Sequence, residues 1–437
     1  MPLKLAGSMK EEHARGHVQG NQAGPRRGVK LAALALGVTL AFATFEVSLR
    51  LVPGIISPKA LILFEPDLRA DIAAGSYALQ KDFREVERDD GGPPLFVPKP
   101  ESPIVSIDAA EDGSERSTDE IGFCNPPGRY AGRERIDVIA LGDSFSWCHA
   151  VRPEQAWPAL VGERTGLSTY SLGLGGKGLY EYVQLLREFG IPKRPRVVIM
   201  NVYGGNDLRD GVVYRDYRAA VERGEPPPSD EPENIAPGLV SSAIGRRSYA
   251  LNFVVAWLSR LAHTDPSKLE KVGIDLRYDV LLSAGEVKFN TENRDRDEIA
   301  VARRLESGAA PLTIWDGALE RLVALAREHS FAAVVSYTPA AYSAYHGSVR
   351  LADPSLAPLL VRFDEAQRRH LSERSASLGL LFLDLTPRLR EAAAHTDASG
   401  LMYGPVHVHL SARGNEVVAQ ALASFLAEKG LASSATP

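Results

Sequence analysis

The stretch Ile136-Asp137-Val138-Ile139-Ala140-Leu141-Gly142-Asp143-Ser144 joins a largely apolar run to a short turn that ends in a serine. A short apolar run bounded by a turn is typical of a buried strand in a parallel sheet. In open α/β sheets, ligands bind at the carboxyl ends of the strands, where the chain turns towards a helix. The sequence therefore predicts that Ser144 lies at the functional edge of a parallel sheet.

From Ile136 onward, apolar runs alternate with amphipathic stretches, which is typical of βα units. We predict strands over residues 136–141, 169–172, 197–203, 332–337 and 380–385. We predict helices over residues 154–164, 179–189, 312–329, 359–376 and 411–428. The predicted fold is a three-layer α/β/α sandwich with a five-stranded parallel sheet over residues 134–430.

Two other parts of the chain have a different pattern. Residues 53–133 are rich in Pro, Gly, Asp and Glu, and we predict a stalk and irregular extension there. Residues 208–311 form an insertion that contains a Pro-rich, acidic loop at 225–237 and an apolar helical stretch at 249–261. Because insertions after strands reach the carboxyl-end face of the sheet, we expect this one to form a lid or a substrate wall.

The N-terminal region carries a membrane-targeting segment. Residues 29–45 are almost wholly apolar, and basic residues precede them, so the positive-inside rule puts residues 1–28 in the cytoplasm. One interpretation is an uncleaved signal anchor over residues 29–52, which we favour because the apolar residues continue to Val52. The other is a cleaved signal peptide with Ala41-Phe42-Ala43 as its cleavage site. The main domain is expected outside the cytoplasm, in the periplasm of a Gram-negative cell, or secreted after cleavage.

The composition is that of a globular enzyme, with 44% hydrophobic and 24% charged residues among 437. A net charge of −5 provides no global basic field, so we expect no nucleic-acid partner. The two cysteines, Cys124 and Cys148, flank the first predicted strand. In an oxidising compartment they form one disulfide, or else they are two separately packed thiols; the sequence leaves both open.

Three later motifs complete an ordered set with Gly142-Asp143-Ser144. They are the glycine-rich run 173–178 after the second strand, Gly204-Gly205-Asn206-Asp207 after the third, and His409-Leu410-Ser411 at the start of the last helix. This order of Ser, Gly, Asn and His resembles the SGNH hydrolases, also called the GDSL esterase superfamily, in a membrane-anchored bacterial form. The resemblance covers roughly residues 120–430 and implies a flavodoxin-like SGNH fold; as an ordered set it is far more specific than any single motif.

The resemblance also implies roles for particular residues. Ser144 would be the nucleophile and His409 its general base. The oxyanion hole would combine the backbone N–H groups of Ser144 and Gly176 with the side-chain amide of Asn206. Each residue also has an ordinary structural interpretation, as a helix cap, a turn or a helix start, but their joint order favours the site. The implied reaction is ester hydrolysis through an acyl-Ser144 intermediate.

One position departs from the family pattern. The family usually carries an aspartate two or three residues before the catalytic histidine, where this chain has His407 and Val406. Asp384 and Asp397 are the nearest acids in sequence, and His407 is a further candidate partner for His409. Alternatively, a backbone carbonyl holds the imidazole and leaves a Ser-His dyad. No carboxylate or cysteine cluster accompanies the two histidines, so we expect no metal and no cofactor.

Three functions remain open on this evidence. The first is an extracytoplasmic serine esterase with an ester or acylated-carbohydrate substrate, anchored to the membrane by its N-terminal helix. The second is a polysaccharide O-acetyltransferase that uses the same acyl-enzyme, as in the SGNH-like alginate O-acetyltransferases. The third is a catalytically impaired glycan-binding module, suggested by the missing acid. A groove of aromatic residues near Trp147, Tyr180 and Tyr203 would favour carbohydrate.

Overall fold

The computed structural model of this protein describes residues 27–56, 60, 64–65, 68, 72, 83–102, 104, 116–225, 235–262, 273–283, 285–397 and 399–432. The chain divides into two compact units. The smaller contains residues 1–72 and 234–259, and the larger contains residues 73–233 and 260–437. Most of the predicted cytoplasmic tail, residues 1–28, and the centre of the Pro-rich loop 225–237 lie outside the described residues.

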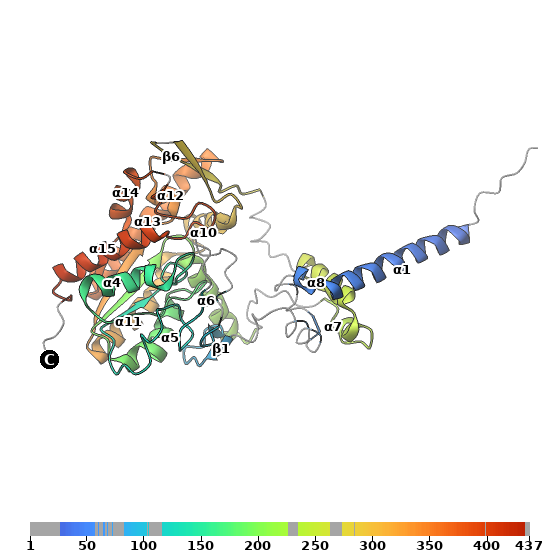
Figure 1. Ribbon diagram of the computed structural model, residues 1–437, viewed down its shortest axis with the longest axis horizontal. Coiled ribbons are helices and arrows are strands. Elements are labelled where there is room, and N and C mark those ends of the chain that lie inside the picture. The colour runs from blue at the N-terminus through green and yellow to red at the C-terminus, as the bar shows by residue number, and fades with distance from the viewer. Residues whose placement is uncertain are drawn as a thin grey trace, which may run out of the picture. The chain divides into compact units, whose positions relative to one another are not determined.

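The larger unit is built on the predicted five-stranded parallel sheet (Figure 1). Its strand order is β10-β8-β5-β3-β4. The bounds are β3 Val138–Leu141, β4 Thr169–Ser171, β5 Val197–Tyr203, β8 Ala332–Thr338 and β10 Leu381–Asp384. Every residue of the central strand β5 is buried, as expected for a parallel strand covered on both faces. The predicted fold class is thus confirmed, with each strand end within two residues of its predicted position.

Helices flank the sheet in two groups that pack within themselves. One group consists of α5 (Leu179–Leu185), α11 (Asp316–His329) and α13 (Ala357–Leu378). The other consists of α4 (Trp157–Thr165), α14 (Thr386–Ala394) and α15 (Ala412–Glu428). The structure also has helices that the sequence did not predict, among them α6 (Asp207–Glu222), α10 (Asp297–Glu306) and α14. Helices α6 and α14 follow strands β5 and β10 closely in the sequence.

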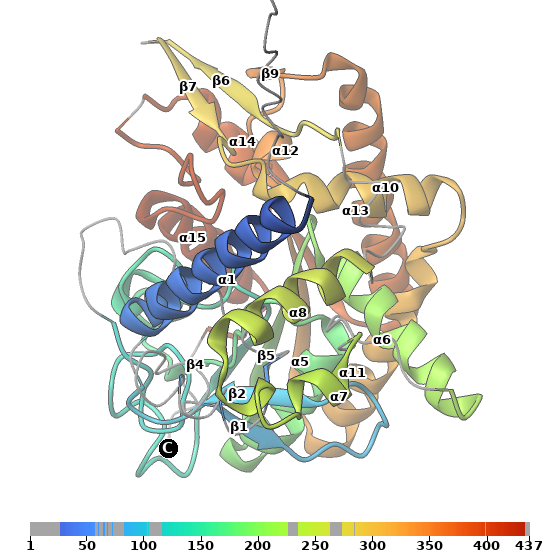
Figure 2. The same cartoon turned by 90° about the vertical axis from the view of Figure 1, so that its right-hand side faces the viewer.

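A second, three-stranded sheet lies at one end of the larger unit, beside α12 and α14 (Figures 1 and 2). It has the order β7-β6-β9 and is antiparallel. Its strands are β6 Tyr278–Leu282, β7 Gly285–Phe289 and β9 Val349–Leu351, and α10 (Asp297–Glu306) and α12 (Ala341–Ala344) lie next to them in sequence. Strands β6 and β7 belong to the insertion, which is therefore folded in part.

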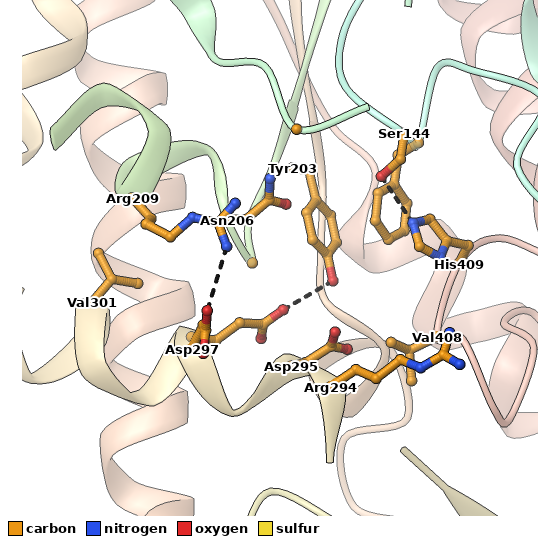
Figure 3. A pocket seen from close by; sticks show the side chains of 14 residues that line it. Ser144, Tyr203, Asn206, Arg209, Arg294, Asp295, Asp297, Val301, Val408 and His409 are labelled. Carbon is orange, nitrogen blue, oxygen red and sulfur yellow. Dashed lines mark hydrogen bonds and ion pairs between the residues drawn. The ribbon is translucent and has the colours of Figure 1, made fainter. Parts of the chain in front are cut away.

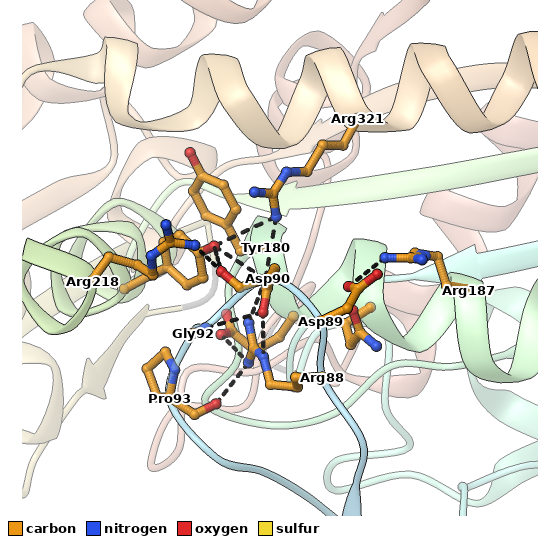
Figure 4. A network of polar contacts seen from close by, with 12 residues as sticks. Arg88, Asp89, Asp90, Gly92, Pro93, Tyr180, Arg187, Arg218 and Arg321 are labelled. Atoms are coloured by element: carbon orange, nitrogen blue, oxygen red, sulfur yellow. Dashed lines mark hydrogen bonds and ion pairs between the residues drawn. The ribbon is translucent and has the colours of Figure 1, made fainter. Parts of the chain in front are cut away.

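Part of the predicted stalk, residues 53–133, is an ordered element of the larger unit. Strands β1 (Phe83–Val86) and β2 (Leu95–Pro98) form an antiparallel hairpin. Between them, the buried Arg88 guanidinium pairs with Asp90 (2.8 Å) and with Glu181 of α5 (2.9 Å) (Figure 4). Burial opposes ionisation of Asp90, but the hydrogen bonds and charge of Arg88 lower its pKa to about 2. This buried ion pair fixes the hairpin against the domain, which composition alone did not indicate.

The smaller unit contains the apolar helix α1 (Arg27–Leu51) together with α7 (Pro237–Val240) and α8 (Tyr249–Ala262) from the insertion. Within α1, Val29–Leu51 is long and apolar enough to cross a membrane. The described side chains of this helix are almost all exposed. Exposed apolar side chains along a helix of this length are unfavourable in water.

Candidate active site

Ser144 lies two residues beyond Gly142, where β3 turns into a loop. A side chain at Gly142 would collide with the hydroxyl of Ser146, so this turn requires glycine. The buried Asp143 carboxyl accepts the backbone N–H of Phe145 (2.8 Å) and thereby holds the turn. Burial raises the pKa of Asp143 to about 7. This turn leaves the Ser144 side chain half-buried at the carboxyl edge of the sheet.

Ser144 and His409 meet directly (Figure 3). His409 Nε2 lies 2.8 Å from Ser144 Oγ, and His409 Nδ1 lies 2.7 Å from the backbone oxygen of His407. A carbonyl oxygen only accepts, so Nδ1 carries the proton and Nε2 is left to accept one. Val408, between the two histidines, has a left-handed backbone (φ +52°), a costly conformation for a β-branched residue. This turn brings the His407 carbonyl back onto the ring of His409.

Neither candidate acid contacts His409. Asp384 pairs with Arg368 (2.6 Å) and accepts the backbone N–H of Thr386 (2.9 Å). The exposed Asp397 accepts hydrogen bonds from the backbone and side chain of Ser399. Across the described part of the chain, no carboxylate hydrogen bonds to His409. The partner of Nδ1 is therefore a backbone carbonyl, one of the arrangements that the sequence had left open.

His149 is a site residue that sequence reasoning missed. Its ring stacks on that of His409, with centroids 3.8 Å apart and planes 28° apart, and the ring of Phe145 stacks at 4.9 Å. Burial, followed by the nearby His149 and His407, lowers the pKa of His409 well below 6.5. His409 is therefore neutral at physiological pH, the form that accepts a proton. No motif surrounds His149 in the sequence, and its only marker is the adjacent Cys148.

The three predicted oxyanion residues line one cavity of about 220 Å³ together with His409. Gly176 adopts a left-handed conformation (φ +69°), and a side chain there would meet no neighbour, so the position is open to substrate. Asn206 precedes α6, and its side-chain nitrogen donates to Asp210 Oδ2 (2.8 Å). The Asn206 side chain also hydrogen bonds with the buried Asp143 carboxyl. The sequence motifs thus converge on one cavity.

Charged side chains line the other side of this cavity (Figure 3). They are Arg209 of α6, Arg294 and Asp295 of the 3-10 turn before α10, and Asp297 and Glu298 at the start of α10. Burial raises the pKa of Asp295 to about 7 and also raises the pKa of Glu298, to which the hydroxyl of Tyr203 donates (3.3 Å). Residues of the insertion therefore form a wall of the cavity, and that wall is polar.

Of the three aromatic residues considered for a carbohydrate groove, only Tyr203 lines this cavity, where it stacks on Phe145 at 3.6 Å. Tyr180 instead stacks on Tyr214, beside the Arg88 ion pairs (Figure 4). Trp147 is half-buried and packs against the core. Of the three residues expected to form the groove, the cavity therefore keeps only Tyr203, with Phe145 beside it.

The structure joins Cys124 and Cys148 in a disulfide, with Cα atoms 5.7 Å apart. The bond links the loop before β3 to the loop after Ser144 and ends one residue before His149. Among the described residues, no group of three or more His, Cys, Asp or Glu side chains has an arrangement that holds a metal ion.

Several solved structures are similar to this chain. One is a protein of the lipolytic G-D-S-L family from Desulfitobacterium hafniense DCB-2 (13% identity over 66% of this chain and 99% of that one, TM-score 0.34). A second is the acetylxylan esterase Axe2 from Geobacillus stearothermophilus (14% identity over 68% of this chain and 95% of that one, TM-score 0.34). A third is the α/β hydrolase LAE5 from the metagenome of Lake Arreo, Spain (13% identity over 70% of this chain and 98% of that one, TM-score 0.33). No protein-family model matches the sequence, and no curated protein matches it. At these identities the likeness concerns the fold alone.

Proposed function

We propose that this protein is a serine esterase of the SGNH type that is anchored by α1 and acts outside the cytoplasm. The observation that carries the proposal is the contact of 2.8 Å between Ser144 Oγ and His409 Nε2, with His409 Nδ1 occupied by a carbonyl. This arrangement presents a neutral imidazole to the serine hydroxyl, as general-base activation of a nucleophile requires. The apolar helix Val29–Leu51 supports the anchor.

The proposed reaction has two half-reactions. Ser144 Oγ attacks the ester carbonyl while its proton passes to His409 Nε2, and the oxyanion is held by the donors of Ser144, Gly176 and Asn206. Collapse of the tetrahedral intermediate breaks the ester C–O bond, and the His409 proton leaves with the alcohol. Water then attacks the acyl-Ser144 carbonyl while one of its protons passes to His409 Nε2. Collapse of this second tetrahedral intermediate breaks the bond between the acyl carbon and Ser144 Oγ and releases the acid, and the His409 proton returns to Ser144 Oγ.

The missing carboxylate has a consequence for the rate. A carboxylate in this position stabilises the imidazolium that forms during each half-reaction, whereas a carbonyl offers only a dipole. The lowered pKa of His409 shows that its surroundings also disfavour the imidazolium, which must form in each half-reaction. We therefore expect slow turnover compared with an enzyme that has a complete triad.

The cavity supports a short acyl group on a hydroxyl-rich alcohol. Its volume of about 220 Å³ is smaller than that of drug-sized sites, so a long acyl chain would not be enclosed. The carboxyl groups of Asp295 and Glu298, with raised pKa values, supply donors and acceptors for sugar hydroxyls. The same polar wall favours a second candidate, transfer of the acetyl group to a glycan hydroxyl instead of water.

The test is labelling of the full-length protein with a fluorophosphonate probe, followed by intact mass. We expect one adduct that is abolished by Ser144→Ala and strongly reduced by His409→Ala. The matched controls Ser399→Ala and His346→Ala replace exposed residues of the same types and retain the adduct. A folded protein without an adduct would overturn the esterase proposal and support a glycan-binding module. If an adduct forms, acetyl release from an aryl acetate with and without added oligosaccharide separates hydrolase from transferase.

A further inference from the structure

A second apolar surface lies next to α1 in the smaller unit, on the part of the insertion that contains α7 and α8 (Figure 1). Its exposed apolar side chains are Ile235, Leu239, Ile244, Val254, Trp257 and Leu258. Ile244 is 73% exposed and Trp257 is 56% exposed, which are large values for side chains of this size. A group of exposed apolar side chains on one short segment marks a surface that binds something apolar.

Among the described side chains of helix α8, those that are exposed are apolar. Val254, Trp257 and Leu258 follow the i, i+3, i+4 spacing, so they share one exposed side of the helix. On the packed side, Val255 and Ala256 are buried, and Asn252 donates to the backbone oxygens of Gly245 and Ser248. An apolar helix face is normally buried, in a core or in a membrane.

The last two turns of α1 hold this segment in place. The Glu46 carboxylate accepts the hydroxyl of Ser248 (2.9 Å) and the backbone N–H groups of Tyr249 (3.1 Å) and Ala250 (2.8 Å). It thus caps the N-terminus of α8 from another helix. Glu46 also pairs with Arg50 (2.6 Å), one turn further along α1. The acid within an apolar helix is therefore fully engaged, as a position at the membrane boundary requires.

Aromatic and cationic groups lie at the same junction. Phe45 of α1 packs edge-on against Phe253 of α8, with ring centroids 5.5 Å apart. The Arg50 guanidinium lies 4.7 Å above the ring of Tyr249. Arg246 and Arg247 are exposed, and residues 235–259 contain no Asp or Glu. Basic and aromatic residues beside an apolar face are typical of helices that lie in the membrane interface.

We propose that residues 235–259 are a membrane-interface segment, held against the outer end of α1 and embedded in the same bilayer leaflet. Trp257, Ile244 and their apolar neighbours enter the boundary between headgroups and acyl chains, and Arg246 and Arg247 meet lipid phosphates. The inference rests on the proposed anchor, because the apolar surface of α1 continues into this segment. This part of the insertion then binds lipid, whereas Arg209 at its start and the residues around α10 border the cavity.

The test uses the full-length chain in nanodiscs of phosphatidylethanolamine and phosphatidylglycerol. A single added cysteine carries the fluorophore NBD in Trp257→Cys, Ile244→Cys, Leu36→Cys within α1, or Val361→Cys on α13. The native cysteines are paired, so only the added one is labelled. Trp257 and Ile244 are exposed, so their replacement leaves the packed face intact. Doxyl-labelled lipid then reports contact between each probe and the acyl chains.

We expect doxyl lipid to quench the probes at Trp257 and Ile244 by about half, as at Leu36, and the probe at Val361 by about a tenth or less. Probes at Trp257 and Ile244 that behave like the one at Val361 would overturn the proposal. So would probes that are shielded from water yet not quenched, because a protein partner would then cover the surface. An unquenched probe at Leu36 would show that the anchor itself is wrong, whereas quenching at Leu36 alone would refute only the interface segment.

Discussion

The imidazole of His409 is held by the backbone carbonyl of His407, 2.7 Å from its Nδ1, and not by an acidic side chain. A carbonyl fixes the tautomer and the ring orientation as a carboxylate does, but it brings no negative charge. The strained Val408 between the two residues makes this contact possible. The geometry of a serine hydrolase is thus kept, while the electrostatic support for its charged intermediate is weakened.

The first prediction concerns pH. His409 acts as a base only when neutral, and its lowered pKa keeps it neutral to below pH 6.5. We expect kcat/KM for an aryl acetate to remain on its plateau at pH 6.5 and to fall only as the pH drops through the lowered pKa. The measurement is a pH–rate profile of the full-length protein. An acid limb centred at or above pH 6.5 would contradict the environment described for His409.

The second prediction concerns the stacked ring of His149. His149→Phe keeps the stacking on His409 but removes a group that disfavours its protonation, so the acid limb should move to higher pH. His149→Ala also loses the stacking and should lower kcat by about two- to tenfold. His346→Phe, at an exposed histidine outside the cavity, is the matched control. A profile unchanged in His149→Phe would mean that His149 has no electrostatic effect on the base.

The third prediction concerns the donor of Asn206. Removal of one oxyanion donor typically costs about 10²–10³ in kcat, so Asn206→Ala should lower kcat by that factor with little change in KM. Asp210→Ala removes one of the two carboxyl groups that orient the amide, at 2.8 Å, and should cost less than about tenfold. Steady-state kinetics on an aryl acetate measures both. Equal losses in the two variants would argue that Asn206 acts by structure alone.

The fourth prediction separates stability from activity at Asp384. Asp384→Asn weakens the ion pair with Arg368 (2.6 Å) and should lower the free energy of unfolding by about 1–3 kcal/mol. Because Asp384 does not contact His409, kcat should be unchanged in the folded protein. Asp397→Asn, at an exposed site, should change neither quantity by much. Urea unfolding and steady-state kinetics test both variants; a large loss of kcat in either would restore that acid as a triad member.

The sheet was predictable because most residues of its central strands are apolar. Residues 197–203 are strand β5 with the predicted bounds. A strand that is buried on both faces is apolar along most of its length, so its ends can be located from the sequence. The helix predicted from residue 154 begins instead at Trp157, after a short 3-10 turn, and Pro158 stands in its first turn. The β1–β2 hairpin was not predictable, because the partner of Arg88 that fixes it to the domain, Glu181, is 93 residues away in the sequence.

The sequence by itself determined the fold class, the apolar N-terminal helix and four residues that line the cavity, Ser144, Gly176, Asn206 and His409, because each of these depends on local pattern and motif order. Tertiary structure alone decided what holds His409, that His149 stacks on it, and that residues 234–259 associate with α1. The first is a hydrogen bond to a backbone carbonyl, the second is a contact between ring faces, and the third includes hydrogen bonds from Glu46 to the first N–H groups of α8. Such contacts depend on how the chain folds back on itself, and no residue type or spacing encodes them locally.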